Sequence, residues 1–290
     1  MIVSVLDKKS GAGFFSSYFF LLNHYIYSKK NNLPFFIESQ NWLYKSQKGW
    51  NDYFVFQCPK KEDNSRVVGH NELCDNYSMF EYNNFSKELF VLNEETKEKI
   101  NNIKNDLELP SYYDSIYIRR GDKLVRESNI VPAEKFIELL LTKSPDTKCI
   151  FLMTDDYNTF IDLENYCNNK NLQIKIITLC SPDLTGQVVY HSLLDENKTH
   201  KSLNEEYFAS VLPSLKKIKS LDMMTTEEIH AHTIDLLANV EIVLNSGTCI
   251  YDLQSNVSRF IGINHVKNNA YDVKFNEKIN FHWTMHPSYW

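Results

Sequence analysis

The chain has 290 residues, of which 43% are hydrophobic and 23% charged, and its formal net charge at pH 7 is −6. These proportions are typical of a folded protein with a core, and the acidic balance excludes a broadly basic face, so we expect no nucleic-acid partner. No stretch approaches the roughly 20 apolar residues of a membrane-spanning helix, and the six cysteines are scattered without a CxxC pair. We therefore expect a cytoplasmic protein with free thiols and no membrane span.

The amino-terminal part predicts a β-α-β unit. Residues 2–6 form the first expected strand, residues 14–27 an almost uniformly apolar helix, and residues 33–37 the next strand. A helix that is apolar all round is expected to lie buried between layers. Such a unit predicts parallel strand pairing with a right-handed crossover. The signal then weakens until a polar helix predicted at 94–106.

After Leu109-Pro110, where we place a domain boundary, strands and helices alternate again. The expected elements are strand 115–119, helix 132–143, strand 148–153, helix 157–169, strand 173–178, helix 225–239 and strand 241–245. This alternation is typical of a doubly wound parallel sheet. The rhythm is broken only by residues 181–221, and a segment of that length without expected elements is commonly functional.

Charged residues gather directly after the strand at 115–119. Arg119 and Arg120 follow its apolar residues, and ligands of open α/β sheets bind at the carboxyl ends of strands. Two planar guanidinium groups suit a diphosphate, because each can fork onto phosphate oxygens and stays charged when partly desolvated. Lys123 adds a point charge, and Glu127 is a candidate general base. The segment therefore predicts a site for a phosphorylated leaving group beside an acid–base group.

Other interpretations of the chain remain open. The arginines could end a solvated strand, with Glu127 in a surface salt bridge to Lys123 or Arg126. The run Gly11-x-Gly13-x-x-Ser16 with Glu38 resembles a dinucleotide fingerprint, which would indicate an NAD-dependent oxidoreductase. No GxxxxGK[ST] motif occurs. His230-x-His232 would point to different faces of its helix, so we expect no metal site.

Several motifs resemble those of the α1,6-fucosyltransferase family, which includes the animal core fucosyltransferases and the rhizobial chitooligosaccharide enzymes. Residues 37–50 resemble the family signature Glu-Ser-Gln-Asn-Trp-Arg-Tyr with its following Gly-Gly-Trp. Residues 118–123 stand where the family has Val-Arg-Arg-Thr-Asp-Lys, with Glu127 at the family's spacing. Residues 151–156 and 253–259 resemble its Ala-Thr-Asp-Asp and Phe-Ser-Ser-Gln-Val-Cys-Arg runs. The resemblance extends from about residue 10 to 263.

The resemblance implies an α/β fold of the GT-B type, with two Rossmann-like doubly wound domains facing a cleft. Residues 1–110 would form the acceptor-side domain, residues 111–275 would bind the nucleotide sugar, and the tail at 276–290 is a candidate to pack on the first domain. The implied reaction transfers L-fucose from GDP-fucose to a hydroxyl of a glycan acceptor, with inversion, an α1,6 linkage and neither metal nor other cofactor. The run 118–122 also matches the α1,2-fucosyltransferases, and a non-catalytic nucleotide- or glycan-binding protein is a further alternative.

By similarity, the catalytic residues are Arg120, Lys123 and Glu127. Arg119 and Arg120 would hold the diphosphate, while Lys123 and Glu127 would assist the acceptor hydroxyl. The residues expected to complete the nucleotide-sugar site are Tyr44, Ser255, Asn256 and Val257. Ser255 and Asn256 also suit a helix N-cap.

Two positions depart from the family pattern. Tyr117 stands where the animal enzymes have a histidine just before the arginines. The family's guanine-binding aspartate aligns with Thr233, and Asp235, two residues further on, is the candidate to replace it.

Overall fold

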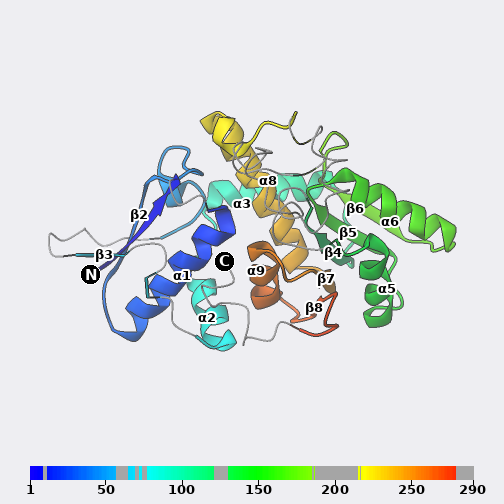
Figure 1. Ribbon diagram of the computed structural model, residues 1–290, viewed down its shortest axis with the longest axis horizontal. Coiled ribbons are helices and arrows are strands. Elements are labelled where there is room, and N and C mark those ends of the chain that lie inside the picture. Colours follow the sequence, from blue (N-terminus) through cyan, green and yellow to red (C-terminus); the bar gives the residue numbers. More distant parts are fainter. Residues whose placement is uncertain are drawn as a thin grey trace, which may run out of the picture. The chain divides into compact units, whose positions relative to one another are not determined.

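The computed structural model describes residues 1–8, 12–56, 65–68, 72–73, 77–120, 130–184, 186, 215 and 217–278 (Figure 1). Within these ranges the chain forms two compact units. Unit 1 contains Met1–Asn101 and Thr225–Ile234, and unit 2 contains Asn102–Met224 and Asp235–Ile279. The tail predicted at 276–290 lies, beyond residue 278, outside the described residues, and so does most of 181–221.

Unit 1 contains a parallel sheet in the order β2-β1-β3. Its strands are β1 (Ile2–Asp7), β2 (Phe35–Asn41) and β3 (Arg66–Val68), and α1 (Phe14–Lys30) connects the first two. The sheet pairs Ile2 with Phe35 and Val5 with Glu38 in parallel register. Thirteen of the 17 residues of α1 are buried. The predicted β-α-β unit with a buried helix is confirmed.

Two further helices follow β3 in the chain, and unit 1 includes the second of them as far as Asn101. Helix α2 (Met79–Leu89) was not predicted, although Ser78 and Glu81 form a capping box at its start: the Ser78 hydroxyl accepts from the Glu81 N–H at 3.2 Å, and a Glu81 carboxylate oxygen accepts from the Ser78 N–H at 2.7 Å. The spacing S-x-x-E is the sequence signal that could have located this helix. Helix α3 (Glu94–Asp106) has the predicted bounds, and the short 3₁₀ helix η2 spans Gly49–Asp52.

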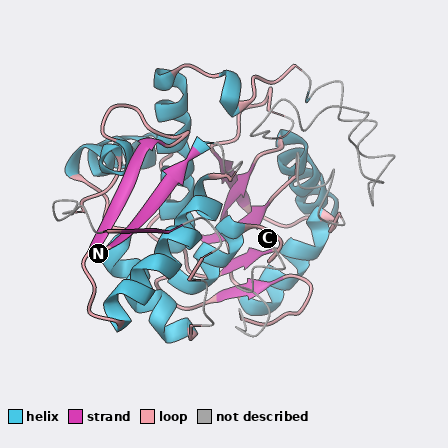
Figure 2. Cartoon of the chain, turned by 60° about the vertical axis from the view of Figure 1, so that its left-hand side comes forward, coloured by secondary structure: helices cyan, strands magenta, loops and turns pink. Residues whose placement is uncertain are grey.

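Unit 2 is built on a five-stranded parallel sheet in the order β6-β5-β4-β7-β8. Strands are drawn in magenta and helices in cyan in Figure 2. Chain order runs outward from β4 through β5 to β6 on one side, whereas β7 and β8 lie on the other side. The strand order therefore reverses between β4 and β7, and this switch point is where ligands bind in open α/β sheets. The strands are β4 (Asp114–Ile118), β5 (Cys149–Thr154), β6 (Lys175–Thr178), β7 (Cys249–Tyr251) and β8 (Ala270–Asp272).

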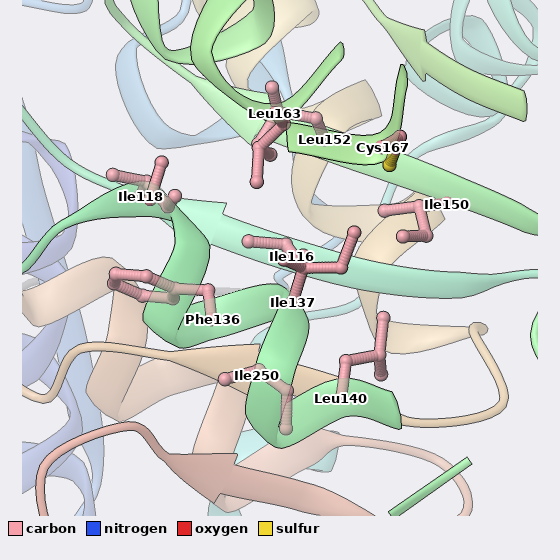
Figure 3. Close-up of a cluster of buried hydrophobic side chains, with 11 residues drawn as sticks. Ile116, Ile118, Phe136, Ile137, Leu140, Ile150, Leu152, Leu163, Cys167 and Ile250 are labelled. Carbon is pink, nitrogen blue, oxygen red and sulfur yellow. The ribbon is translucent and has the colours of Figure 1, made fainter. Parts of the chain in front are cut away.

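Helices cover the sheet of unit 2. Helices α5 (Ala133–Lys143) and α6 (Tyr157–Asn169) pack on one face, where the core includes Ile116, Ile118, Phe136, Leu152 and Leu163 (Figure 3). Helix α8 (Thr226–Leu244) contributes its residues through Ile234 to unit 1 and the remainder to unit 2. Helix α9 (Asn256–Asn264) follows β7, and the 3₁₀ helix η5 (Leu221–Met223) precedes α8. The predicted doubly wound arrangement of parallel strands and helices is confirmed.

The strand predicted at 241–245 is wrong. Helix α8 continues through Leu244, and the strand follows only at Cys249–Tyr251. Val240, Ile242 and Val243 are fully buried. Their apolar, β-branched side chains are therefore compatible with a buried helix as well as with a strand. Periodicity cannot separate the two over so short a run.

A buried polar network lies at the amino-terminal edge of this sheet. The hydroxyl oxygens of Ser115 and Ser246 are 2.8 Å apart, and the Ser246 oxygen lies 3.2 Å from Nε2 of His265. Nδ1 of His265 accepts a hydrogen bond from the Asn269 N–H at 3.2 Å. The imidazole is therefore neutral with its hydrogen on Nε2, and burial lowers its pKa from 6.5 to about 4.

We expect acid to destabilise the protein through His265. Between about pH 6.5 and 4 the unfolded chain binds a proton on this residue and the native chain does not, so stability present above pH 6.5 is lost as the pH falls toward 4. At about 1.4 kcal/mol per pKa unit, the full loss is roughly 3 kcal/mol. Urea unfolding from pH 7.5 to 4.5 measures it. His265→Gln should flatten the pH dependence; equal slopes for variant and wild type would contradict the assignment.

Candidate functional site

The predicted arginines lie at the switch point of unit 2. Ile118 ends β4 within the core, and Arg119 and Arg120 follow it directly. Arg120 is only 7% exposed, and its Nη2 donates to the Val131 carbonyl oxygen at 2.8 Å. A guanidinium held in this way has a fixed direction, which excludes the interpretation of Arg120 as a solvated surface side chain.

Asp155 fixes both arginines from the neighbouring strand. It follows β5, whose Thr154 pairs with Ile118, so its carboxylate reaches the end of β4. One oxygen accepts from the Arg120 backbone N–H at 2.7 Å, and the other forms an ion pair with Nη1 of Arg119. The Arg119 and Asp155 side chains are 18% and 12% exposed, so salt screens this pair less than a surface pair. We call Arg119, Arg120 and Asp155 the arginine cluster.

The arginine cluster has two guanidinium groups that can donate to a phosphate group. Its three side chains carry two positive charges and one negative charge, a net +1. Partial burial raises the pKa of nearby Asp162 on α6, and the positive charge of Arg120 opposes this rise. The sequence motif at 151–156 contained Asp155, but only the register of β4 and β5 identifies it as the partner of Arg119.

Asp156, the neighbour of Asp155, has a structural task. It is 2% exposed and caps α6, where its carboxylate accepts from the Asn158 N–H at 3.1 Å. The two adjacent aspartates at the end of β5 therefore separate into a partner for the arginines and a helix cap.

The other side of the switch point is formed by the loop after β7 and by the start of α9. Ser255 caps α9 and accepts from the Ser258 N–H at 3.0 Å, and its oxygen lies 3.1 Å from the Tyr117 hydroxyl oxygen. Asn256 and Val257 are the first two residues of the helix, and the Asn256 side-chain oxygen accepts from Nη1 of Arg259 at 2.8 Å. The structure therefore brings Ser255 to the end of the strand that carries the arginines.

Tyr44 belongs to the aromatic core of unit 1. It is 2% exposed, and its ring centroid lies 5.2 Å from that of Phe14 and 5.3 Å from that of Trp42. Its carbonyl oxygen accepts from the Tyr53 hydroxyl at 2.7 Å. Its expected contact with the nucleotide sugar stays a prediction.

The signature at 37–50 is explained largely by local structure in unit 1. The Ser39 hydroxyl oxygen accepts from the Trp50 N–H at 2.9 Å. Gly49 has φ +69°, and a Cβ there would collide with Ser39, so only glycine fits. The Asp52 carboxylate accepts from the backbone N–H groups of residues 46, 47 and 48. These contacts fix the loop after β2.

The two candidates for guanine recognition are Thr233 and Asp235, and the Thr233 hydroxyl is already used in a hydrogen bond within its helix. Thr233 is fully buried, and its hydroxyl donates to the Ile229 carbonyl oxygen at 2.7 Å. Asp235 is an exposed residue, and neighbouring atoms desolvate its carboxyl group enough to raise its pKa. Asp235 therefore stays the better candidate. Lys123 and Glu127 lie in 121–129, outside the described residues.

No group of three histidine, cysteine, aspartate or glutamate side chains in the described part of the chain could hold a metal ion. The ring of His230 instead stacks on Tyr53, with centroids 5.5 Å apart. Within the same described ranges, no helix combines the length and apolar character that crossing a bilayer requires.

The parallel sheets and their helices define an α/β protein, and the likeness to solved structures supports a fold of the GT-B type. The chain is similar to the crystal structure of NodZ alpha-1,6-fucosyltransferase soaked with GDP-fucose, with a TM-score of 0.54, 9% identity, and coverage of 92% of this chain and 96% of that one. It is also similar to fucosyltransferase NodZ from Bradyrhizobium, with a TM-score of 0.50, 10% identity, and coverage of 91% and 92%. No protein-family model and no curated protein matches the chain. The predicted α/β fold of the GT-B type is confirmed, and the cleft between its two domains stays a prediction.

Proposed function

We propose that the chain is an inverting, metal-independent glycosyltransferase that moves L-fucose from GDP-fucose to a glycan hydroxyl, forming an α1,6 linkage. The observation that carries this proposal is the arginine cluster at the switch point of unit 2. Two fixed guanidinium groups at this place suit the diphosphate of a nucleotide sugar. The likeness to a structure soaked with GDP-fucose supports the same donor.

The proposed reaction is a single displacement. The acceptor oxygen forms a bond to the anomeric carbon of fucose while the bond from that carbon to the β-phosphate oxygen breaks, and GDP leaves with the electron pair. Arg119 and Arg120 bind the diphosphate, and Arg120 stabilises the negative charge that grows on it, an effect that is strongest in a site poor in water. Glu127 removes the proton of the acceptor hydroxyl, assisted by Lys123.

A panel of GDP- and UDP-sugars, scored by thermal shift and then by transfer to oligosaccharide acceptors, tests the proposal. We expect GDP-fucose to raise the melting temperature most, because ligand binding to the native state stabilises it. Stabilisation by a UDP-sugar and not by GDP-fucose would contradict the donor. Binding without transfer to any acceptor would favour a non-catalytic binding protein. The linkage of the product separates α1,6 from α1,2 transfer.

A further inference from the structure

A continuous chain of polar groups runs from β4 to the loop after β7. The Tyr117 hydroxyl oxygen lies 3.1 Å from that of Ser255, which lies 2.8 Å from that of Ser258. The Ser258 hydroxyl reaches the carbonyl oxygen of Asp252 at 2.5 Å. The side chains of Tyr117, Ser255 and Ser258 belong to residues that are 3%, 5% and 0% exposed. Water therefore has little access to these hydrogen-bonded groups.

The direction of each hydrogen bond in the chain follows from its last member. A carbonyl oxygen only accepts, so the Ser258 hydroxyl donates to Asp252. The hydrogen between the two serines must then come from Ser255. The Ser255 oxygen already accepts from the Ser258 N–H at 3.0 Å, and its second lone pair receives the Tyr117 hydroxyl hydrogen. Tyr117 thus donates to Ser255, and the Ser255 hydroxyl is fully used within the protein.

We infer that Tyr117 is a positioning residue for the donor diphosphate. It lies on β4 two residues before Arg119, and its hydroxyl holds Ser255, the N-cap of α9. This hydrogen bond joins the two elements that meet at the switch point, and so sets the first turn of α9 against the strand end that carries the arginine cluster. The inference rests on the proposed function. It also gives a role to the tyrosine that replaces the histidine of the resembling family.

The substitution Tyr117→Phe tests this role, because it removes one hydroxyl and keeps the buried ring. Loss of a buried hydrogen bond should weaken GDP binding, measured by calorimetry, about three- to tenfold. The KM for the donor should rise by the same factor, while kcat changes by less than about twofold. Ser255→Ala interrupts the same series of hydrogen bonds. The double variant Tyr117→Phe/Ser255→Ala should therefore bind GDP no more weakly than Ser255→Ala alone.

Tyr113→Phe is the matched control. The Tyr113 hydroxyl donates to the Ile242 carbonyl oxygen at 2.9 Å, at the opposite edge of the same sheet. This variant should lose a similar amount of melting temperature and bind GDP like the wild type. Hydrogen exchange of the Ser258 and Arg259 amides should quicken in Tyr117→Phe and not in Tyr113→Phe, because both amides bond to Ser255.

The outcomes separate the two proposals. Three results would each overturn the positioning role. They are wild-type affinity for GDP in Tyr117→Phe, a loss of GDP affinity in Tyr113→Phe equal to that in Tyr117→Phe, and unchanged amide exchange at the start of α9 in Tyr117→Phe. Failure of the wild-type protein to bind GDP would overturn the proposed function. The two outcomes can be told apart, because amide exchange is measured without nucleotide and does not depend on GDP binding.

Discussion

Replacing Arg120 with alanine should weaken GDP binding by about 10- to 100-fold, since hydrogen bonds to charged groups contribute about 1.5–3 kcal/mol each. Turnover should fall further, because the guanidinium also meets charge that develops only as the sugar–phosphate bond breaks. Arg120 is 7% exposed, its Nη2 donates to the Val131 carbonyl oxygen and its backbone N–H donates to Asp155, so the direction of its side chain is fixed. Calorimetry with GDP and initial rates of fucosyl transfer measure the two effects.

Two companion variants make the Arg120 result specific. Arg120→Lys keeps the charge but loses the planar fork, so it should recover only part of the affinity. Arg66→Ala removes an arginine whose ion pair with Glu72, at 3.4 Å, is exposed, and it should leave GDP binding unchanged. A folded Arg120→Ala protein that binds GDP as tightly as the wild type would remove the arginine cluster from the donor site.

The sequence predicts elements well where local signals and burial agree. Helices α3 and α6 have the predicted bounds, and α6 begins at an aspartate cap, the residue type that favours a helix start. The all-apolar stretch of α1 correctly predicted a buried helix. In each case a single structure satisfies both the local preference and the hydrophobic pattern.

Local signals fail where burial is complete. The apolar end of α8 predicts a strand from its sequence, because buried residues such as Ile242 and Val243 suit a helix and a strand equally. The order β6-β5-β4-β7-β8 depends on contacts between segments far apart in the chain, so neither the switch point nor the pairing of Asp155 with Arg119 follows from residue types alone.

The candidate site shows the same division. The motif that contains Ser255 predicts a residue near the nucleotide sugar, and the structure places it at the strand end that carries the arginines. Its hydroxyl, however, serves as a helix cap, the alternative that its residue type also favoured. Motif resemblance gives the location of a residue, whereas the hydrogen bonds of its side chain decide which atoms remain for a ligand.

Glu127→Gln should abolish most turnover and leave GDP affinity intact. A general base is typically worth about 10² to 10⁴ in rate, and glutamine keeps the size of the side chain while it cannot take up the acceptor proton. Initial rates of transfer and calorimetry with GDP give the two quantities separately. A loss of GDP affinity with unchanged kcat would instead place Glu127 in donor binding.

The alternative interpretation, a surface salt bridge, has a matched control in unit 2. Glu138 is exposed on α5, forms an ion pair with Lys135 at 3.0 Å and accepts from the Tyr166 hydroxyl at 3.4 Å. Glu138→Gln therefore changes only surface contacts and should retain full turnover. The pH profile provides a second discriminating measurement. If Glu127 is the base, wild-type kcat falls below the pKa of its carboxyl group in the donor–acceptor complex, and the residual activity of Glu127→Gln loses this acid limb. An acid limb retained in the variant would assign the proton transfer to another group.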